Sequence, residues 1–185
     1  MKTVTEQERL LAATVEHLEA HGIGDLSLRQ LAAAIGTSHR MLIYHFGSKD
    51  GLLRAVVQAV EREQLDALRA LDRDTNLSEA DLMRNMWKRF SAPAMWPKIR
   101  LFYEVYGNAL GARTSTFLDE VVESWVEPLA AELKRTRGMT AGDARAEARL
   151  RVAVERGLLL DLVTTGDRAS VNRAHERFIA MCEAQ

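Results

Sequence analysis

The sequence has few of the features on which disulfide-linked proteins, cysteine-based metal sites and membrane-spanning proteins depend. It holds a single cysteine, Cys182, which excludes an intramolecular disulfide and a cysteine-based zinc cluster. The longest apolar run, from Gly157 to Val163, is broken by an acid and is far shorter than the roughly 18 residues of a membrane span. The N-terminal segment has no apolar stretch of the kind that a secretory signal needs. We therefore expect a soluble, cytoplasmic protein with no membrane partner.

Proline and glycine are also scarce, at 3 and 11 residues, whereas strong helix formers such as alanine, leucine, glutamate and arginine dominate. Alternating β-branched runs bounded by turn residues are nearly absent. Helix starts are marked four times by Ser or Thr with an acid or amide three residues later, at Thr5, Ser27, Ser78 and Thr140. The pattern predicts an all-α protein. Nine helices are expected, at about residues 4–21, 27–35, 38–45, 49–72, 78–91, 96–110, 115–136, 141–165 and 170–182.

Two short predicted helices near the N-terminus are joined by a very tight turn. The first begins at Ser27 and carries apolar residues at the spacing that buries one face. The turn is the tripeptide Gly36-Thr37-Ser38, and the second helix follows directly. A helix, a tight turn with glycine and another helix form a helix-turn-helix, but an ordinary antiparallel helix pair shares this geometry. The spacing alone leaves both interpretations open.

The local distribution of charge favours a DNA-binding surface. The net charge of the chain is only −1 and points to no partner. Between Leu26 and Lys49, however, there is no acid in a chain that has 26 of them, whereas Arg29, Arg40 and Lys49 are basic. Carboxylates repel phosphates, and each phosphate that is neutralised releases counterions. An acid-free, partly basic helix pair is therefore suited to a phosphate backbone.

The same segment carries a family resemblance. From Gly36 to Leu53 it reads GTSHRMLIYHFGSKDGLL, which resembles the signature of the tetracycline-repressor (TetR) family. In words, that signature is Gly-Val-Ser, a few variable residues, Leu-Tyr-x-His-Phe, two residues, Lys, an acid and a Leu pair. The stretches Arg9–Gly22 and Ser27–Ala32 are similar to the family's first two helices. The chain departs from the pattern at Ile43, where the family usually has tyrosine, and at Leu28, where it often has threonine.

The resemblance implies a helix-turn-helix DNA-binding domain at residues 1–47 and a ligand-binding and dimerisation domain at residues 48–185. It implies a transcription regulator, expected to be a repressor that a hydrophobic small molecule releases from a palindromic double-stranded DNA operator. Arg40 is the expected base reader, because a guanidinium pairs bidentately with guanine O6 and N7. Lys49 is expected to contact phosphate. The full set of candidate DNA contacts is Ser27, Arg29, Thr37, Ser38, His39, Arg40, Met41, Tyr44, His45 and Lys49.

Large apolar side chains cluster in the middle of the chain. Six of its 11 aromatic residues lie between positions 83 and 106, with methionines among them. Adaptable methionines and large rings suit an irregular apolar pocket, although aromatic stripes on helices are usually core. The family's C-terminal helices enclose an effector, which favours a pocket for an apolar, planar or aromatic small molecule. The candidate lining residues are Met83, Met86, Trp87, Phe90, Trp96, Phe102, Tyr103 and Tyr106.

The last two predicted helices are apolar over an arc too wide for one internal contact. Excess apolar surface on paired helices predicts a homodimer sealed by a four-helix bundle, and the family dimerises through the same two helices. The apolar residues are Leu150, Ala153, Val154, Gly157, Leu158, Leu159, Leu162 and Val163 of the eighth helix, and Val171, Ala174, Phe178, Ile179 and Met181 of the ninth.

Signals for enzymatic chemistry are poor. His17 and His21 have the spacing of a metal-binding pair, but no third ligand is in view and the acids beside them indicate a solvated face. No Ser-His-Asp order, glycine-rich phosphate loop or paired buried carboxylate emerges. We expect no catalytic residues, no metal and no cofactor. Two other interpretations stay open: an effector-independent DNA-binding protein, and a helical ligand-binding protein or enzyme without DNA binding.

Overall fold

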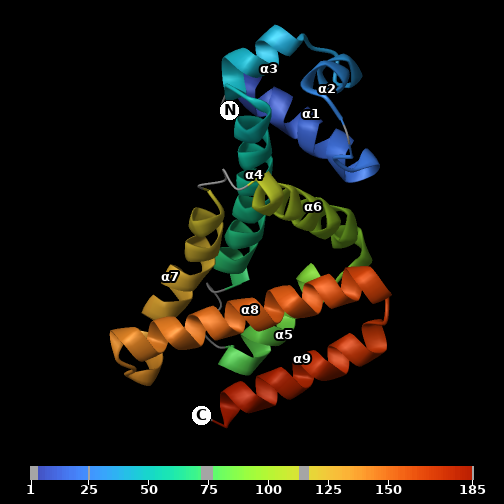
Figure 1. Ribbon diagram of the computed structural model, residues 1–185. Helices are drawn as coiled ribbons and strands as arrows, with labels where there is room; N and C mark the ends of the chain where they lie inside the picture. Colours follow the sequence, from blue (N-terminus) through green and yellow to red (C-terminus); the bar gives the residue numbers. More distant parts are fainter. Residues whose placement is uncertain (1–3, 25, 72–76, 113–116, 185) are drawn as a thin grey trace. The chain divides into compact units, whose positions relative to one another are not determined.

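The computed structural model describes residues 4–24, 26–71, 77–112 and 117–184, and every regular element within these ranges is a helix (Figure 1). The elements are α1 (Glu6–His21), α2 (Leu28–Ala34), α3 (His39–Phe46), α4 (Lys49–Leu71), α5 (Glu79–Phe90), the 3-10 helix η1 (Pro93–Met95), α6 (Trp96–Ala112), α7 (Leu118–Arg137), α8 (Ala141–Thr165) and α9 (Arg168–Glu183). All nine predicted α-helices are present, which confirms the all-α fold. The predicted helix end at residue 72 and helix start at 115 lie outside the described residues. No described helix has the length and hydrophobicity that a membrane crossing requires.

The predicted caps are formed at all four marked helix starts. At α1 the hydroxyl oxygen of Thr5 accepts the N–H of Glu8 at 3.2 Å, and the Glu8 carboxylate accepts the N–H of Thr5 at 2.8 Å. Ser27 caps α2 with the same reciprocal pair of bonds, whereas at α5 and α8 the hydroxyl oxygens of Ser78 and Thr140 accept the N–H groups of Asp81 and Asp143. Each cap satisfies a backbone donor that the first helical turn leaves without a partner.

The chain divides into two compact units, which are described separately. The N-terminal unit consists of residues 1–63 and 100–118, and the C-terminal unit of residues 64–99 and 119–185. Helices α4 and α6 each contribute residues to both units. The N-terminal unit therefore extends beyond residue 47, because Leu52 of α4 is part of its core. The functional division into residues 1–47 and 48–185 stays a prediction.

One core cluster of the N-terminal unit lies where α2, α3 and α4 meet. Its buried residues are Leu31 and Ala32 of α2, Leu42 of α3 and Leu52 of α4. Helix α6 is tied to the same unit by a polar contact, since Glu104 accepts the backbone N–H of Ile23 at 2.8 Å. That hydrogen bond fastens α6 to the connection between α1 and α2.

The junction of α3 and α4 is very close. Gly47, at φ +76°, ends α3 in the left-handed region, and the hydroxyl oxygen of Ser48 accepts the N–H of Gly51 at 2.9 Å. A Cβ placed on Gly51 would lie only 2.0 Å from the carbonyl oxygen of Phe46. A side chain at Gly51 would therefore push the last turn of α3 away from α4.

We predict that Gly51→Ala lowers the midpoint of thermal unfolding. Alanine in place of glycine normally stabilises a helix interior by up to about 1 kcal/mol. At Gly51 the added methyl group meets the Phe46 carbonyl instead, and overpacking of this kind costs roughly 1–3 kcal/mol. Gly107→Ala, inside α6, is the matched control, because nothing lies within 4 Å of its added Cβ. A rise in the midpoint for both variants would contradict the close approach.

The C-terminal unit is held by two apolar clusters. Helices α8 and α9 run alongside each other and α5 packs against α9 (Figure 1). One cluster joins α7 to α8 through buried residues that include Val126 and Ala148. The other joins α5, α8 and α9 through Trp87, Leu162 and Val171.

A network of ion pairs and hydrogen bonds joins four helices of the same unit. Arg151 of α8, whose side chain is 5% exposed, donates to Glu147 at 2.7 Å and to Glu79 of α5. Arg137 of α7 donates to Glu79 at 2.8 Å and to the backbone carbonyl of Cys182 on α9 at 2.9 Å. Burial by itself would raise the pKa of Glu79, but hydrogen bonds from Arg151 and Arg137 outweigh it and hold that pKa below its ordinary value.

Candidate nucleic-acid interface

A closed turn fixes α3 against α2. Gly36 takes a φ of +70°, and the N–H of Thr37 donates to the carbonyl of Ala32 at 2.8 Å. The hydroxyl oxygen of Ser38 then accepts the N–H of Met41 at 3.2 Å and starts α3. These local hydrogen bonds fix the angle between α2 and α3, although the segment contains no long apolar run.

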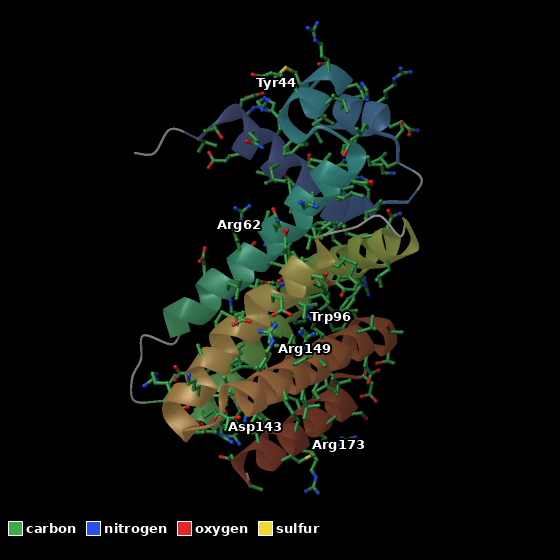
Figure 2. All side chains as sticks on the ribbon, turned by 60° about the vertical axis from the view of Figure 1, so that its left-hand side comes forward. Tyr44, Arg62, Trp96, Asp143, Arg149 and Arg173 are labelled. Carbon is green, nitrogen blue, oxygen red and sulfur yellow. The ribbon has the colours of Figure 1, made fainter. Side chains whose placement is uncertain are left out.

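One side of α3 is buried and the other is exposed. Leu42 is 1% exposed and belongs to the core of the N-terminal unit. His39, Arg40, Ile43 and Tyr44 are exposed, and we call these four residues the outer face of α3. Tyr44 is 78% exposed, and Figure 2 shows its position on α3. The first turn of the outer face carries the His39 imidazole and the Arg40 guanidinium. The second turn carries the large side chains of Ile43 and Tyr44.

The predicted DNA-contacting residues all lie in or next to this helix pair. Ser27, Arg29, Ser38, His39, Arg40 and Tyr44 are exposed, and Thr37, Met41, His45 and Lys49 are half-buried. Two of them also have a structural task, since the hydroxyl groups of Ser27 and Ser38 cap α2 and α3. None of the ten residues belongs to the buried core. Their contacts with DNA stay a prediction.

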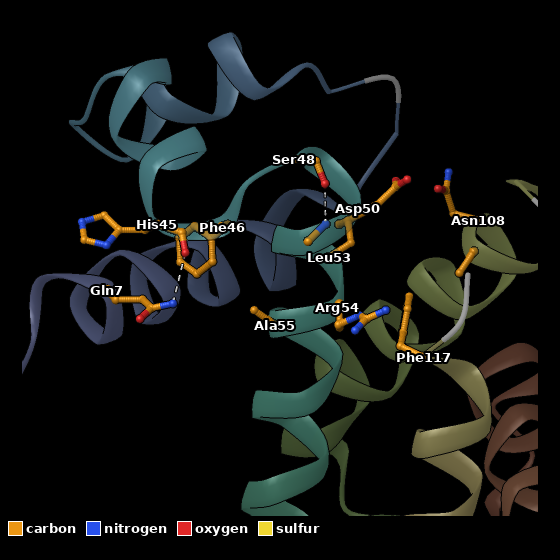
Figure 3. Close-up of a pocket in the computed structure, with 12 residues that line it drawn as sticks. Gln7, His45, Phe46, Ser48, Asp50, Leu53, Arg54, Ala55, Asn108 and Phe117 are labelled. Carbon is orange, nitrogen blue, oxygen red and sulfur yellow. Dashed lines mark hydrogen bonds between the residues drawn. The ribbon is translucent and has the colours of Figure 1, made fainter. Parts of the chain in front are cut away.

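The end of α3 is held by α1. The side-chain amide of Gln7 donates to the carbonyl oxygen of His45 at 3.2 Å (Figure 3). The His45 ring lies edge-on to Tyr44, with ring centres 4.9 Å apart, and its centre is 6.3 Å from that of Phe46. His45 thus links an exposed ring of the outer face to a ring that packs on the core.

A cleft of about 420 Å³ lies beside the junction of α3 and α4 (Figure 3). Its lining comes from α1, α3, the first two turns of α4, the end of α6 and Phe117. The guanidinium carbon of Arg54 stands 5.4 Å from the centre of the Phe117 ring, a cation–π distance. None of the eight residues predicted to bind an effector lines this cleft.

Those eight residues divide between the two units. Met83, Met86, Trp87, Phe90 and Trp96 belong to the C-terminal unit, whereas Phe102, Tyr103 and Tyr106 belong to the N-terminal unit. In the C-terminal unit, Trp87 and Trp96 share one apolar cluster, and Trp87 is 6% exposed. In the N-terminal unit, the Phe102 ring lies 5.1 and 5.5 Å from those of its two tyrosine neighbours.

Sequence reasoning misses the polar residues around Trp87. The buried ring of His175 on α9 stacks on Trp87 at 4.4 Å, and its Nε2 lies 2.9 Å from a carboxylate oxygen of Glu155. Its Nδ1 finds no hydrogen-bond partner within the described part of the chain. The indole N–H of Trp87 donates to Asn172 at 2.8 Å. The sequence signal that could have indicated the burial of His175 is its spacing, because it follows buried Val171 by four residues and therefore lies on the same helix face.

Comparison with known proteins identifies the N-terminal region. Residues 10–56 match the family model described as bacterial regulatory proteins, tetR family. The HTH-type transcriptional regulatory protein RaaS of Mycobacterium tuberculosis is 35% identical over 80 residues, a match that covers 41% of this chain and 37% of RaaS. The chain thus matches little more than a third of the length of that relative. The HTH-type transcriptional regulator BetI of Pseudomonas paraeruginosa is 27% identical over 187 residues, covering 91% of this chain and 86% of BetI.

A solved structure extends the likeness in fold to nearly the whole chain. The crystal structure of a transcriptional regulator from Rhodococcus sp. Rha1 superposes with a TM-score of 0.77 and 22% identity, covering 96% of this chain and 95% of the other. At this identity the likeness concerns the fold. Together with the family match at residues 10–56, it confirms a helix-turn-helix at the N-terminus of an all-α chain.

Proposed function

Because residues 10–56 match the family model of bacterial regulatory proteins, tetR family, we propose that the chain is a TetR-family transcription regulator that binds double-stranded operator DNA through α2 and α3. The observation that carries this proposal is the outer face of α3, which is exposed and lies in a segment without acids between residues 26 and 49. A surface of this charge attracts a phosphate backbone, and a helix of this size fits the major groove.

Two basic residues have different roles in the proposed complex. Arg40 lies in the first turn of α3, the end of a recognition helix that meets base edges, and its guanidinium can pair with guanine O6 and N7. Lys49 is the first residue of α4, where the positive end of the helix dipole adds to its own charge. Arg40 therefore reads a base, and Lys49 holds a phosphate.

We predict that Arg40→Ala and Lys49→Ala weaken DNA binding in different ways. Loss of Arg40 should cost about 1–3 kcal/mol and relax the base preference at one operator position in each half-site. Loss of Lys49 should lower affinity uniformly across sequences and reduce the slope of log affinity against log salt by about one. Both effects are measured by fluorescence-anisotropy titrations between about 50 and 200 mM salt. The probes are the DNA upstream of the gene that encodes this chain and versions of that DNA with single base changes.

Arg62→Ala is the matched control, because this exposed arginine belongs to the same unit but lies on α4 outside the helix-turn-helix (Figure 2). It should change neither the base profile nor the salt slope. An affinity that does not depend on salt would contradict the electrostatic part of the proposal. A chain that binds no DNA would support the alternative of a helical ligand-binding protein or enzyme.

We further propose that an apolar small molecule regulates DNA binding from a site beside Trp87. The aromatic and methionine side chains of α5 supply apolar surface, and His175 and Asn172 supply the few polar groups that orient a ligand. A strongly anionic or sugar-like ligand would leave polar groups unpaired there, at a cost of several kcal/mol. In a dimer, each copy presents one α3 helix to the major groove. An effector that favours a distance between these two helices that does not match successive grooves would release the DNA.

We predict that planar aromatic compounds quench the tryptophan fluorescence of the protein, and that Trp87→Ala weakens their binding without changing DNA affinity in their absence. All three tryptophans, Trp87, Trp96 and Trp125, lie in the C-terminal unit, so the signal reports on that unit alone. Trp125→Phe is the matched control and should retain ligand binding. If no aromatic compound alters either fluorescence or DNA affinity, the effector-independent alternative is favoured.

We also propose that two copies associate through α8 and α9. Part of the apolar arc predicted from the sequence is used inside the chain, because Leu162, Val171, Phe178 and Ile179 are buried. Two other large members of that arc face outward, since Leu150 and Met181 are 54% and 56% exposed, and Leu160, which the predicted arc did not include, is 45% exposed. Exposed Ala153 and Gly157 lie between the two leucines, on the same side of α8. Small residues flanked by leucines allow close helix packing, as a symmetric four-helix interface requires.

We predict that the wild-type chain sediments as a dimer and that Leu160→Glu shifts it towards the monomer mass of 20.7 kDa. A carboxylate in the centre of an apolar interface is desolvated without a partner, which strongly opposes association. Leu110→Glu is the matched control, since Leu110 is 59% exposed on α6 and should not affect the mass. A wild-type mass near 20.7 kDa would end this proposal.

A further inference from the structure

We propose that Ile43 contacts the 5-methyl group of a thymine in the major groove, so that each operator half-site carries a thymine close to the base that Arg40 reads. The inference rests on the proposed DNA-binding function and states what the apolar part of the outer face of α3 recognises.

The exposure of Ile43 is the first observation. Leu42 of α3 is 1% exposed and fills the core with Phe46 packed beside it, whereas Ile43 is left 37% exposed. A single exposed apolar residue is common on protein surfaces. Here, however, Tyr44 follows at 78% exposure, so two large side chains in succession expose apolar surface on a short helix. Such a surface is suited to a partner with an apolar group.

The position of Ile43 relative to Arg40 is the second observation. Residues three apart on an α-helix lie on the same side, and their Cα atoms are separated by about 4.5 Å along the helix axis. Successive base pairs are about 3.4 Å apart. A helix that presents Arg40 to one base therefore presents Ile43 within about two base pairs of it. The two residues read neighbouring positions of one half-site.

The chemistry of the groove selects thymine as the partner. The thymine methyl group is the apolar feature of the major-groove edges, and the other groups there are hydrogen-bond donors and acceptors. An isoleucine side chain has neither donor nor acceptor, so against adenine, guanine or cytosine it would cover polar groups without pairing them. Because isoleucine is β-branched, its χ1 angle is nearly fixed in a helix, and little side-chain freedom is lost on binding. Ile43 is thus preorganised to pack against a methyl group.

Removing the methyl group from the DNA tests the inference directly. An operator is first selected from random double-stranded DNA with the wild-type chain, and each thymine of a half-site is then replaced singly by deoxyuridine, which lacks only the 5-methyl group. Burial of one such group corresponds to about fourfold in Kd. We expect wild-type affinity to fall by about fourfold at one thymine per half-site, within about two base pairs of the guanine that Arg40→Ala ceases to select.

The Ile43→Ala variant should no longer distinguish thymine from deoxyuridine at that position. Ile43→Val keeps the branched carbon and should retain the distinction, as should Leu110→Ala, which shortens an exposed leucine outside α3. Tyr44→Ala separates the two neighbours, because it should retain the distinction if Ile43 makes the contact. Thermal unfolding of each variant should match wild type, since all three side chains are exposed.

Two outcomes overturn the inference while the proposed DNA binding stands. In the first, the selected operator binds but no deoxyuridine replacement weakens wild type. In the second, Ile43→Ala keeps the same sensitive thymine as wild type, which assigns the methyl contact to another residue. If selection recovers no DNA, both the inference and the proposed function are wrong.

Discussion

The close approach of the Phe46 carbonyl to Gly51 is the contact on which the orientation of α3 depends. Helix α3 ends and α4 begins within this contact, so the direction of the short helix is set by the much longer one. Gln7 holds the end of α3 from α1, and buried Leu42 holds its middle against α2. A surface fixed from three sides loses little conformational freedom on binding. The outer face of α3 is therefore presented to a partner in one arrangement.

The sequence predicts the features that depend on near neighbours. The caps at Thr5 and Ser27 need only a partner three residues away, and the exposure of Arg40 follows from its place in a tight helix pair. Features that depend on distant segments escape sequence reasoning. The spacing of His175 from Val171 indicates that its side is buried, but no local pattern shows that it stacks on Trp87 of α5. For the same reason the apolar arc of α8 and α9 could be recognised but not divided into buried and exposed residues.

Helix α6 contributes residues to both units. Its first residue, Trp96, belongs to the apolar cluster of the C-terminal unit, and Glu104, two turns later, accepts the N–H of Ile23 in the N-terminal unit. The packing around Trp96 and the Glu104 hydrogen bond are therefore parts of one continuous helix.

Dissolved salt screens the exposed charges of this chain much more strongly than the buried ones. Those on the proposed DNA-binding surface face solvent, where mobile ions screen them within about 10 Å at 0.1 M salt. Arg151 and Glu147 are only 5% and 11% exposed, so mobile ions have little access to them. The pKa of Glu79 also lies below its ordinary value, so the network holds at neutral pH and is lost only as the pH falls through the acid range. If the proposed surface binds an operator, concentrated salt would accordingly release the DNA while leaving the Arg151–Glu147 pair intact, and dilution would restore binding.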